Sequence, residues 1–445
     1  LANFDQFIDQ VFAPEGEEHS SFNLLSSQST IDALARLFGA SGFLWEDFLR
    51  FQHQNLLPLL ADGQALQQRP TRAELEQELH SALAKATSPT EQRTMLNRFK
   101  DQAMLRIDLR HMLGHSSFPE FSQELSELAE IVISGAVDLA NQALERTHGR
   151  PLLANRQPCP LAVFALGKCG GQEMGYASDV ELSFVYSGDG HTTGPRVIPT
   201  PEYFEHLVKQ VSEFIEHRRE GIFQLDLRLR PYGNQGPLAS PLAAFQRYYQ
   251  PGGGARQFER QALVKMRCIA GDPELAQQVL AIRDQFVYGP EPFDPRELRH
   301  IRTRQVKELV PPGRTHAKYS PGALVDVEYL IQYLQILHGQ SNQALRTPNT
   351  VAALQALYEA RVLDAEVHHN LYEGYLFLRH LINALRIVRG NAKDLLLPLP
   401  GTPEFAALAR RLGFGERQAT LEWEVVHQFG QVEQLFTAYV EREAG

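Results

Sequence analysis

Hydrophobic residues recur with helical spacing in the first third of the chain. Leu125, Leu128, Val132 and Leu139 follow one another at intervals of three, four and seven residues, which places them on one face of a helix. The stretches 64–72 and 114–119 interrupt this pattern with residues that favour turns. The pattern therefore predicts a series of separate helices up to about residue 148.

The hydrophobic period changes to two beyond residue 148. A short apolar run at 161–166, bounded by Pro160 and Gly167, is typical of a buried strand. Along 179–186 polar and apolar positions alternate, with Asp179, Glu181 and Ser183 opposed to Val180, Leu182 and Phe184. Successive side chains of a strand point to opposite faces, so we expect both carboxylates on one solvent-exposed face.

A helix and a third strand are expected next. Thr200 as the N-cap and Pro201 as the first residue begin an amphipathic helix that ends before Gly221. Leucines then alternate with polar residues along 223–230, and Asp226 lies on the polar side of this predicted strand.

Helical periodicity returns beyond residue 290. It is clearest in one run that ends near Gly390 and contains Leu371, Tyr375, Leu378, Ile382 and Leu385. We expect an α+β fold that is predominantly α-helical. It comprises an N-terminal helical region (1–120), a catalytic domain with a small mixed sheet (121–290) and a C-terminal helical bundle (291–445).

Composition narrows the class of protein. A chain of 445 residues usually forms more than one domain. The formal net charge of -10 gives no general attraction to nucleic acid. No apolar run reaches the roughly 18 residues of a membrane helix, and the start has no cationic leader. Three cysteines without metal-binding spacing favour the reducing cytoplasm. Because the first residue is Leu1, we expect a fragment of a longer protein.

The central region brings three acidic residues into one predicted site. Asp179 and Glu181 share a strand face, and a neighbouring strand that carried Asp226 would add a third carboxylate. Adjacent carboxylates repel one another unless cations neutralise them, and Mg²⁺ prefers oxygen ligands and substrate phosphates. Two such ions would support in-line displacement at phosphorus.

Glycines precede these acids. Gly170 and Gly171 allow close approach of a phosphate to the backbone, and Lys168 adds a positive charge. The spacing matches neither a Walker loop nor a dinucleotide-binding loop. Taken singly, each feature has an ordinary structural explanation as a turn, a solvated strand edge or a surface ion pair. Their order along the chain makes nucleotidyl transfer the better interpretation.

Several segments resemble the family of glutamine synthetase adenylyltransferases. The resemblance covers about residues 95–390 and is carried by segments 165–173, 175–181, 226–233, 236–238, 248–249, 258–267 and 318–332. It implies a polymerase-beta-like nucleotidyltransferase core. Members of this family typically contain two catalytic halves. One attaches AMP from ATP to a tyrosine of glutamine synthetase, and the other removes it with phosphate to give ADP.

The resemblance also implies roles for individual residues. Asp179, Glu181 and Asp226 match the metal-binding carboxylates. The residues assigned to nucleotide binding are Lys168, Gly170, Gly171, Ser178, Lys265 and Arg267. Glu181 stands where the family usually has aspartate, and Cys169 stands where it usually has leucine. We interpret Cys169 as a packing residue, and we expect Asp326 and Glu328 to cap a helix.

Three functions remain open on the sequence. The first is an active transferase with ATP, or ADP and phosphate, as substrates, in which the direction of AMP transfer is undetermined. The second is a non-catalytic module that binds glutamine synthetase or a PII-type signal protein, which Glu181 alone supports. The third is a nucleotidyltransferase that modifies a different acceptor.

Overall fold

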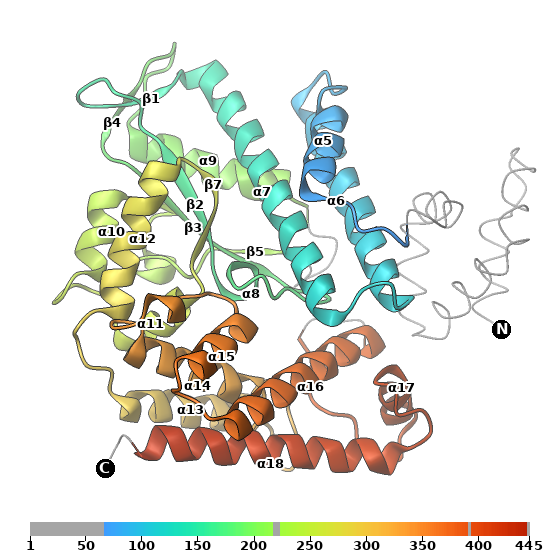
Figure 1. Ribbon diagram of the computed structural model, residues 1–445. Helices are drawn as coiled ribbons and strands as arrows, with labels where there is room; N and C mark the ends of the chain where they lie inside the picture. Colours follow the sequence, from blue (N-terminus) through green and yellow to red (C-terminus); the bar gives the residue numbers. More distant parts are fainter. Residues whose placement is uncertain (1–65, 217–222, 390–392, 443–445) are drawn as a thin grey trace, which may run out of the picture.

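A computed structural model describes residues 66–216, 223–389 and 393–442. A small mixed sheet lies between helices that precede it in the sequence and a larger group of helices that follows it (Figure 1). Helices account for most of these residues, so the predicted α+β fold with predominantly helical content is confirmed. None of the described helices is long and apolar enough to span a membrane.

In the described part of the chain, three helices precede the sheet: α5 (Arg72–Leu83), α6 (Pro89–Met112) and α7 (Phe118–His148). Each begins with a hydroxyl side chain that accepts a hydrogen bond from the first turn, supplied by Thr71, Ser88 and Ser117 in turn. The break predicted at 114–119 is confirmed, and the described part of the break at 64–72 lies directly before α5. The helices expected before residue 66 lie outside the described residues.

The strands among residues 66–216, 223–389 and 393–442 form a five-stranded sheet and a two-stranded one. Their bounds are β1 (Pro151–Leu153), β2 (Leu161–Ala165), β3 (Val180–Tyr186), β4 (Gly190–Thr192), β5 (Leu225–Asp226), β6 (Ala239–Pro241) and β7 (Arg267–Gly271). The larger sheet has the order β5-β3-β2-β7, and β6 pairs with the far end of β3. Strand β2 is antiparallel to β3 and β7, whereas β5 and β6 run parallel to β3.

Hydrophobic cores cover both faces of this sheet. Val163 in β2 and Leu182 in β3 pack toward α5, α6, α7 and α9 (Thr200–Phe214). Phe164 and Val185 point the opposite way and join a core with the helices that follow the sheet. We expected the face of β3 that carries Asp179, Glu181 and Ser183 to be exposed to solvent. This expectation is wrong for most of the strand, because Ser183 and Val185 on that face are buried beneath those helices.

Two predicted elements begin or end elsewhere in the structure. The N-cap of α9 is Pro199, and Thr200 instead uses Oγ1 to accept from the Gly190 amide at 2.9 Å and to donate to the Gly188 carbonyl. The strand predicted at 223–230 contains only the two residues of β5, because the chain turns at Arg228 and bends back on Asp226.

The remaining helices build the second core, and the helical bundle predicted beyond residue 290 is confirmed. The short helix α8 (Gly167–Gly170) follows β2, and η1 (Gly233–Gln235), α10 (Leu242–Tyr249), α11 (Gln257–Val264) and α12 (Pro273–Tyr288) follow β5. The bundle contains α13 (Pro295–Leu309), α14 (Leu324–His338), η2 (Gln343–Leu345), α15 (Thr350–Glu359), α16 (Ala365–Arg389), α17 (Pro403–Arg411) and α18 (Gln418–Arg442). Gly390, expected near the end of a helix, lies outside the described residues.

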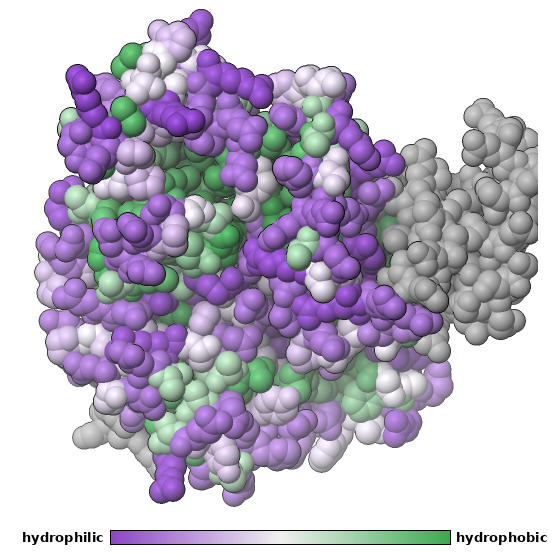
Figure 2. Space-filling model, turned by 45° about the horizontal axis from the view of Figure 1, so that its top comes forward, coloured by the Kyte–Doolittle hydropathy of each residue, from purple (hydrophilic) through white to green (hydrophobic). Residues whose placement is uncertain are grey.

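The bundle closes the lower side of the molecule in Figure 1, and α18 runs along its edge. Hydrophilic residues cover much of the face seen in Figure 2, with hydrophobic residues mainly in recesses between them.

Candidate nucleotidyltransferase site

The three predicted carboxylates meet at the edge of the sheet. Asp179 directly precedes β3, and in the parallel pairing of β3 with β5 Glu181 lies opposite Asp226. All three residues line one cleft of about 670 Å³ between the sheet edge and the C-terminal bundle. The strand alternation expected from the sequence and the register of β5 together produce this arrangement.

Protein groups offset the charge of Glu181 only in part: the nearby charge of Lys318 lowers its pKa, but burial outweighs this effect. Oε2 of Glu181 is buried and, within the described part of the chain, accepts no hydrogen bond. Burial raises the pKa of Glu181 to about 7, and the nearby charges of Asp179 and Asp226 contribute to the increase. A cation in the cleft would stabilise the ionised form of Glu181 and so lower its pKa again. The residues present therefore fit a divalent metal.

Asp226 is engaged by an arginine. Nε of Arg228 donates to both carboxylate oxygens of Asp226, at 2.9 and 3.0 Å. Burial alone would raise the pKa of Asp226, but the hydrogen bonds from Arg228 lower it. Accordingly, among the described residues no three His, Cys, Asp or Glu side chains are arranged as a closed metal site. Asp226 would have to leave Arg228 to complete a set of ligands.

The glycine nearest the carboxylates is Gly167. It has a positive φ of 51°, and a Cβ at this position would lie 2.4 Å from Oε1 of Glu181. Gly167 lines the cleft together with Lys168. Sequence reasoning missed Gly167 because the adjacent glycine pair was the more conspicuous signal.

Gly170 and Gly171 are buried in packing contacts. A Cβ on Gly170 would lie 1.9 Å from the carbonyl oxygen of Lys265, and one on Gly171 would lie 3.0 Å from that of Pro348. Neither glycine is among the residues that line the cleft. The close approach of two backbone segments therefore explains why glycine is needed at Gly170, and nucleotide binding by this pair stays a prediction.

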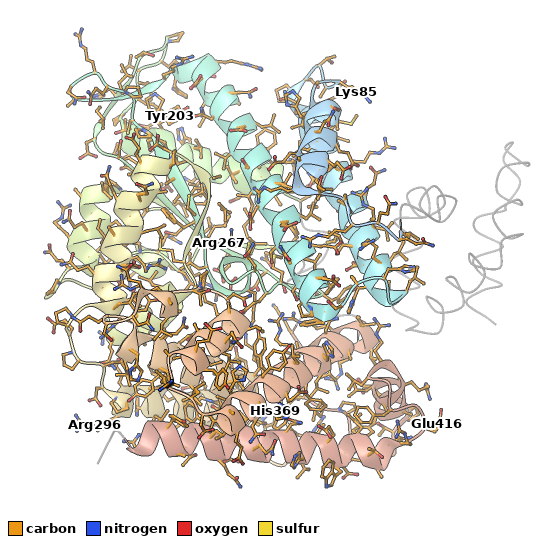
Figure 3. All side chains as sticks on the ribbon, viewed as in Figure 1. Lys85, Tyr203, Arg267, Arg296, His369 and Glu416 are labelled. Carbon is orange, nitrogen blue, oxygen red and sulfur yellow. The ribbon has the colours of Figure 1, made fainter. Side chains whose placement is uncertain are left out.

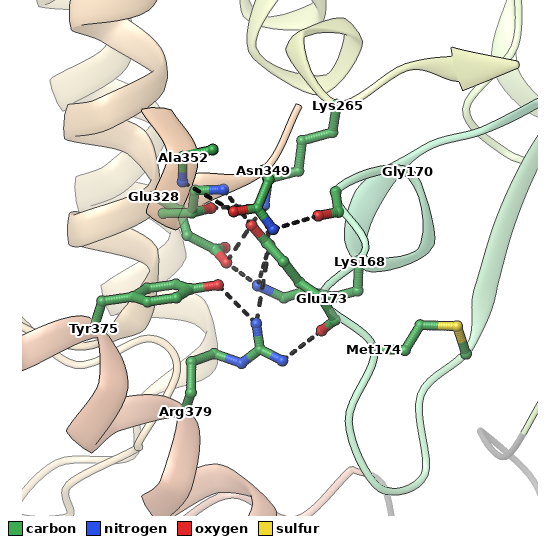
Figure 4. A network of polar contacts seen from close by, with 12 residues as sticks. Lys168, Gly170, Glu173, Met174, Lys265, Glu328, Asn349, Ala352, Tyr375 and Arg379 are labelled. Atoms are coloured by element: carbon green, nitrogen blue, oxygen red, sulfur yellow. Dashed lines mark hydrogen bonds and ion pairs between the residues drawn. The ribbon is translucent and has the colours of Figure 1, made fainter. Parts of the chain in front are cut away.

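A buried polar network forms one wall of the cleft (Figure 4). The carboxylate of Glu173 lies at its centre, where it accepts from Nζ of Lys265 and from the backbone amide of Thr350, and lies 3.8 Å from Nζ of Lys168. Lys265 also donates to the Thr350 hydroxyl at 3.0 Å. Arg379 donates to the backbone carbonyl of Glu173 and, at 2.7 Å, to the hydroxyl of Tyr375.

This network holds positive charges beside the carboxylates. Burial would raise the pKa of Glu173, but Lys265, Lys168 and Arg379 together lower it to about 2. Burial lowers the pKa of Lys168, and the nearby charges of Lys265 and Arg379 lower it further. A phosphate group in the cleft would favour the charged form of Lys168, which suits an anionic ligand.

Glu328 has a different role from the one expected. It was predicted to cap a helix, yet its side chain lies in the cleft and pairs with Nζ of Lys168. Asp326 lies in the first turn of α14, but the N-cap of this helix is Ala323, which has no side-chain cap hydrogen bond. The Oδ2 of Asp326 accepts from the Gly322 amide just before the helix, and its other oxygen pairs with Arg302.

Comparisons with known proteins agree with this site. Residues 31–282 match the family model for glutamate-ammonia ligase adenylyltransferase, which is more than half of the chain. The chain belongs to this family. Residues 297–440 match a second model, that for the PII-uridylyltransferase GlnD.

Curated relatives of the adenylyltransferase family cover most of the chain. A bifunctional glutamine synthetase adenylyltransferase/adenylyl-removing enzyme from Nitrosococcus oceani is 29% identical over 84% of this chain and 39% of its own length. Proteins with the same description from Shewanella woodyi and Xanthomonas campestris pv. campestris are 28% and 32% identical, over 83% and 75% of this chain. The matched region covers 39% and 36% of those two relatives, so the chain spans about two-fifths of their length.

The other residues assigned to nucleotide binding through the adenylyltransferase resemblance differ in position. Ser178 lines the cleft, and its Oγ accepts from the Gly175 amide at 2.9 Å. Lys265 also lines the cleft. Arg267 does not: it lies between the sheet and α7 (Figure 3), pairs with Glu130 and donates to the Gly170 carbonyl at 3.0 Å. These contacts give Arg267 a structural role, and nucleotide contact by it stays a prediction.

The bundle contributes cationic side chains that sequence reasoning missed. Lys318, Arg379 and Arg386 all line the cleft, although they are far from the carboxylates in sequence. Arg379 and Arg386 lie seven residues apart on α16, hence on one helix face, beside the apolar stripe formed by Leu378, Ile382 and Leu385. In the sequence, these two arginines occur within an apolar helical pattern, and this was the feature that could have indicated their position at the cleft.

Cys169 is fully buried, as expected of a packing residue. Burial raises the pKa of its thiol, which makes it a poor nucleophile.

Proposed function

We propose that this chain is a Mg²⁺-dependent nucleotidyltransferase that attaches AMP to a tyrosine of glutamine synthetase, or removes it. One observation carries the proposal: the β3–β5 pairing sets Glu181 opposite Asp226, beside Asp179, in a cleft that also contains Gly167 and Lys168. Membership of the adenylyltransferase family gives the reaction class. The relatives are named for their action on glutamine synthetase, and this supports glutamine synthetase as the protein substrate.

The carboxylates of Asp179, Glu181 and Asp226 would hold the metal, as two Mg²⁺ ions, whose charge would neutralise the phosphates during displacement at phosphorus. Lys168 and Lys265 would contact the phosphates of ATP or ADP. The network around Glu173 would keep these ammonium groups in place. The acceptor hydroxyl attacks phosphorus directly, so the reaction needs no nucleophile from the protein.

Both directions of the reaction balance with this site. In attachment, the tyrosine oxygen bonds to the α-phosphorus of ATP and pyrophosphate leaves. In removal, inorganic phosphate attacks the same phosphorus, the bond to tyrosine breaks and ADP forms. The relatives bear a name that covers both activities.

The purified chain can be tested in both directions. It is incubated with Mg²⁺, ATP labelled at the α-phosphate and unmodified glutamine synthetase. In a parallel reaction, the adenylylated synthetase is supplied with phosphate. Label on the synthetase would establish attachment, and ADP would establish removal. No product in either reaction, together with bound glutamine synthetase, would contradict the enzyme assignment and favour a binding module.

We also propose a PII-type signal protein as a partner of the bundle, on the match of residues 297–440 to the PII-uridylyltransferase model. Addition of such a protein to the same assay should change the rate of AMP transfer. An unchanged rate and no binding to the chain would contradict this partner. The reducing cytoplasm is the proposed compartment, because Cys159, Cys169 and Cys268 are all free thiols.

A further inference from the structure

A second cleft opens beside the carboxylates. It has a volume of about 760 Å³ and overlaps the first cleft, with which it shares Asp179, Asp226, Arg228, Lys318, Tyr319, Arg386 and Leu395. Lys168, Gly167 and Lys265 line only the first cleft, whereas Arg230 and Lys393 line only the second. The edge of the sheet that carries Asp179 and Asp226 is thus open to two overlapping spaces, of which only the first contains Gly167, Lys168 and Lys265.

The two clefts differ in charge. Six basic side chains and five carboxylates line the first, a near balance that suits a metal-bound nucleotide. The second is lined by five basic side chains and two carboxylates, and its basic residues are Arg228, Arg230, Lys318, Arg386 and Lys393. Its two carboxylates are Asp179 and Asp226, the proposed metal ligands, so bound metal would leave the lining strongly cationic.

Arg230 and Lys393 supply positive charge that the first cleft does not share. The guanidinium of Arg230 donates to the Gly236 carbonyl at 3.1 Å, a neutral partner that leaves its charge in place. Lys393 is exposed at the cleft. Leu227, Leu238 and Tyr319 add apolar surface to the lining, suitable for a ring or an aliphatic side chain.

We propose that the second cleft binds the acceptor segment of the protein substrate, and that this segment carries acidic residues beside the tyrosine to be modified. This inference rests on the proposed function. The tyrosine hydroxyl would approach the edge formed by Asp179 and Asp226 from the side opposite Lys168, while its acidic neighbours lie against Arg230 and Lys393. The acceptor and the nucleotide would then reach the reacting phosphorus from different parts of the two overlapping clefts.

A protein segment suits this cleft better than a nucleic acid. The chain has a formal net charge of -10, so a long polyanion would be repelled outside the cleft. A short acidic segment needs only the local positive charge and the apolar lining.

Peptide binding tests the proposal. Three fluorescent peptides share one tyrosine and differ only in flanking residues, which are Glu, Gln or Lys. Their binding is measured by anisotropy in the presence of Mg²⁺ and a non-hydrolysable ATP analogue. We expect the Glu peptide to bind at least about tenfold more tightly than the Gln peptide and the Lys peptide to bind most weakly, with differences that shrink as salt rises.

A charge reversal identifies the cleft. Lys393→Glu should reduce the preference for the Glu peptide at least about threefold and improve binding of the Lys peptide. Lys85→Glu is the matched control, since Lys85 is exposed at the far end of the N-terminal helices (Figure 3) and should leave the preference unchanged.

Equal binding of the three peptides would overturn the proposal, as would an unchanged preference in Lys393→Glu or tighter binding of a single-stranded oligonucleotide of similar length. A separate titration with Mg²⁺ and ATP distinguishes a failure of the acceptor site from a failure of the proposed nucleotidyltransferase function. Nucleotide binding without any peptide preference would refute only the acceptor site, whereas loss of nucleotide binding in the native chain would refute the proposed function itself.

Discussion

The carboxylate of Glu173 stabilises the positive charges that surround it at the wall of the cleft. It is buried and offsets the positive charges of Lys168, Lys265 and Arg379. Because its pKa in the folded protein, about 2, lies below the ordinary value of 4.5, its contribution to stability is present above pH 4.5. That contribution is lost as the pH falls toward 2.

Glu173→Gln should destabilise the protein strongly. The substitution leaves three cations close together without their central anion, and breaking a buried pair in this way costs about 3–5 kcal/mol. The free energy of unfolding in urea at neutral pH measures the effect. Glu76→Gln is the control: Glu76 pairs with Arg72 at the surface, where loss of a pair costs about 0–1 kcal/mol. A loss at Glu173 as small as that at Glu76 would contradict the role assigned to the network.

Gly167→Ala should impair catalysis more than folding. The added Cβ would meet the Glu181 carboxylate at 2.4 Å in a backbone conformation that alanine rarely adopts. We expect AMP transfer to fall at least about tenfold, while the strained backbone costs about 1–3 kcal/mol of stability.

Gly175→Ala is the matched control for this change. Its Cβ would find no atom closer than 3.7 Å, so transfer and stability should both stay near the native values. Full transfer activity in Gly167→Ala would show that this turn does not shape the site.

At the scale of elements, the sequence indicated the strands but not their exact extents. Alternation along 179–186 correctly placed Asp179 and Glu181 on one side, because the period of two follows from backbone geometry. The same alternation at 223–230 overestimated β5, since Arg228 returns to Asp226 and ends the strand. Phe223 and Tyr232 have positive φ angles of 55° and 62°, which no feature of their residue types indicates.

The register between the strands also cannot be predicted from the sequence. Nothing in the residues alone sets Glu181 opposite Asp226, because that pairing depends on how the chain between β3 and β5 packs. For the same reason, the contributions of Glu328 and Arg379 to the cleft became visible only in three dimensions. These residues belong to helices 150 or more positions from Gly167, on faces whose partners the sequence does not specify.

The packing of α6 near α17 predicts a pH dependence. Burial raises the pKa of Asp108, in α6, from 3.8 to about 8, although the charge of Arg411 in α17 acts in the opposite direction. Between these pH values the folded chain binds a proton at Asp108 that the unfolded chain releases. Stability from this group is therefore complete below pH 3.8 and is lost as the pH rises through about 8.

Asp108→Asn should reduce the pH dependence of the free energy of unfolding. Asparagine keeps the shape of the side chain but cannot ionise, so the variant should lose less stability between about pH 5 and about pH 8 than the native chain. Each unit of pKa shift corresponds to roughly 1.4 kcal/mol, which gives an expected difference of a few kcal/mol in urea unfolding. Glu78→Gln, at an exposed position of α5, should show the native slope. Identical slopes for Asp108→Asn and the native chain would refute the assignment.

At the scale of the whole molecule, the sheet divides two cores and the cleft forms where they meet. β3 and β5 supply the carboxylates, the segment after β2 supplies Gly167 and Lys168, and α14 and α16 supply Glu328 and Arg379. The boundaries predicted at residues 120 and 290 remain predictions, and residue 120 falls within the first turn of α7. Because one core joins Phe164 of the sheet to helices as far as α18, the bundle stabilises the edge that carries the site.

The most direct test of the central claim is the rate of AMP transfer by the native chain and by Asp179→Asn and Asp226→Asn, measured with Mg²⁺ in whichever direction the native chain catalyses. Asp189→Asn, an exposed acid next to the same strand, is the control. The proposed site predicts that both cleft variants lose at least about a hundredfold in rate while their unfolding in urea stays close to that of the native chain, because each removes a ligand charge and little packing. Native rates in either cleft variant, with the control equally active, would contradict a metal-dependent site at the edge formed by β3 and β5.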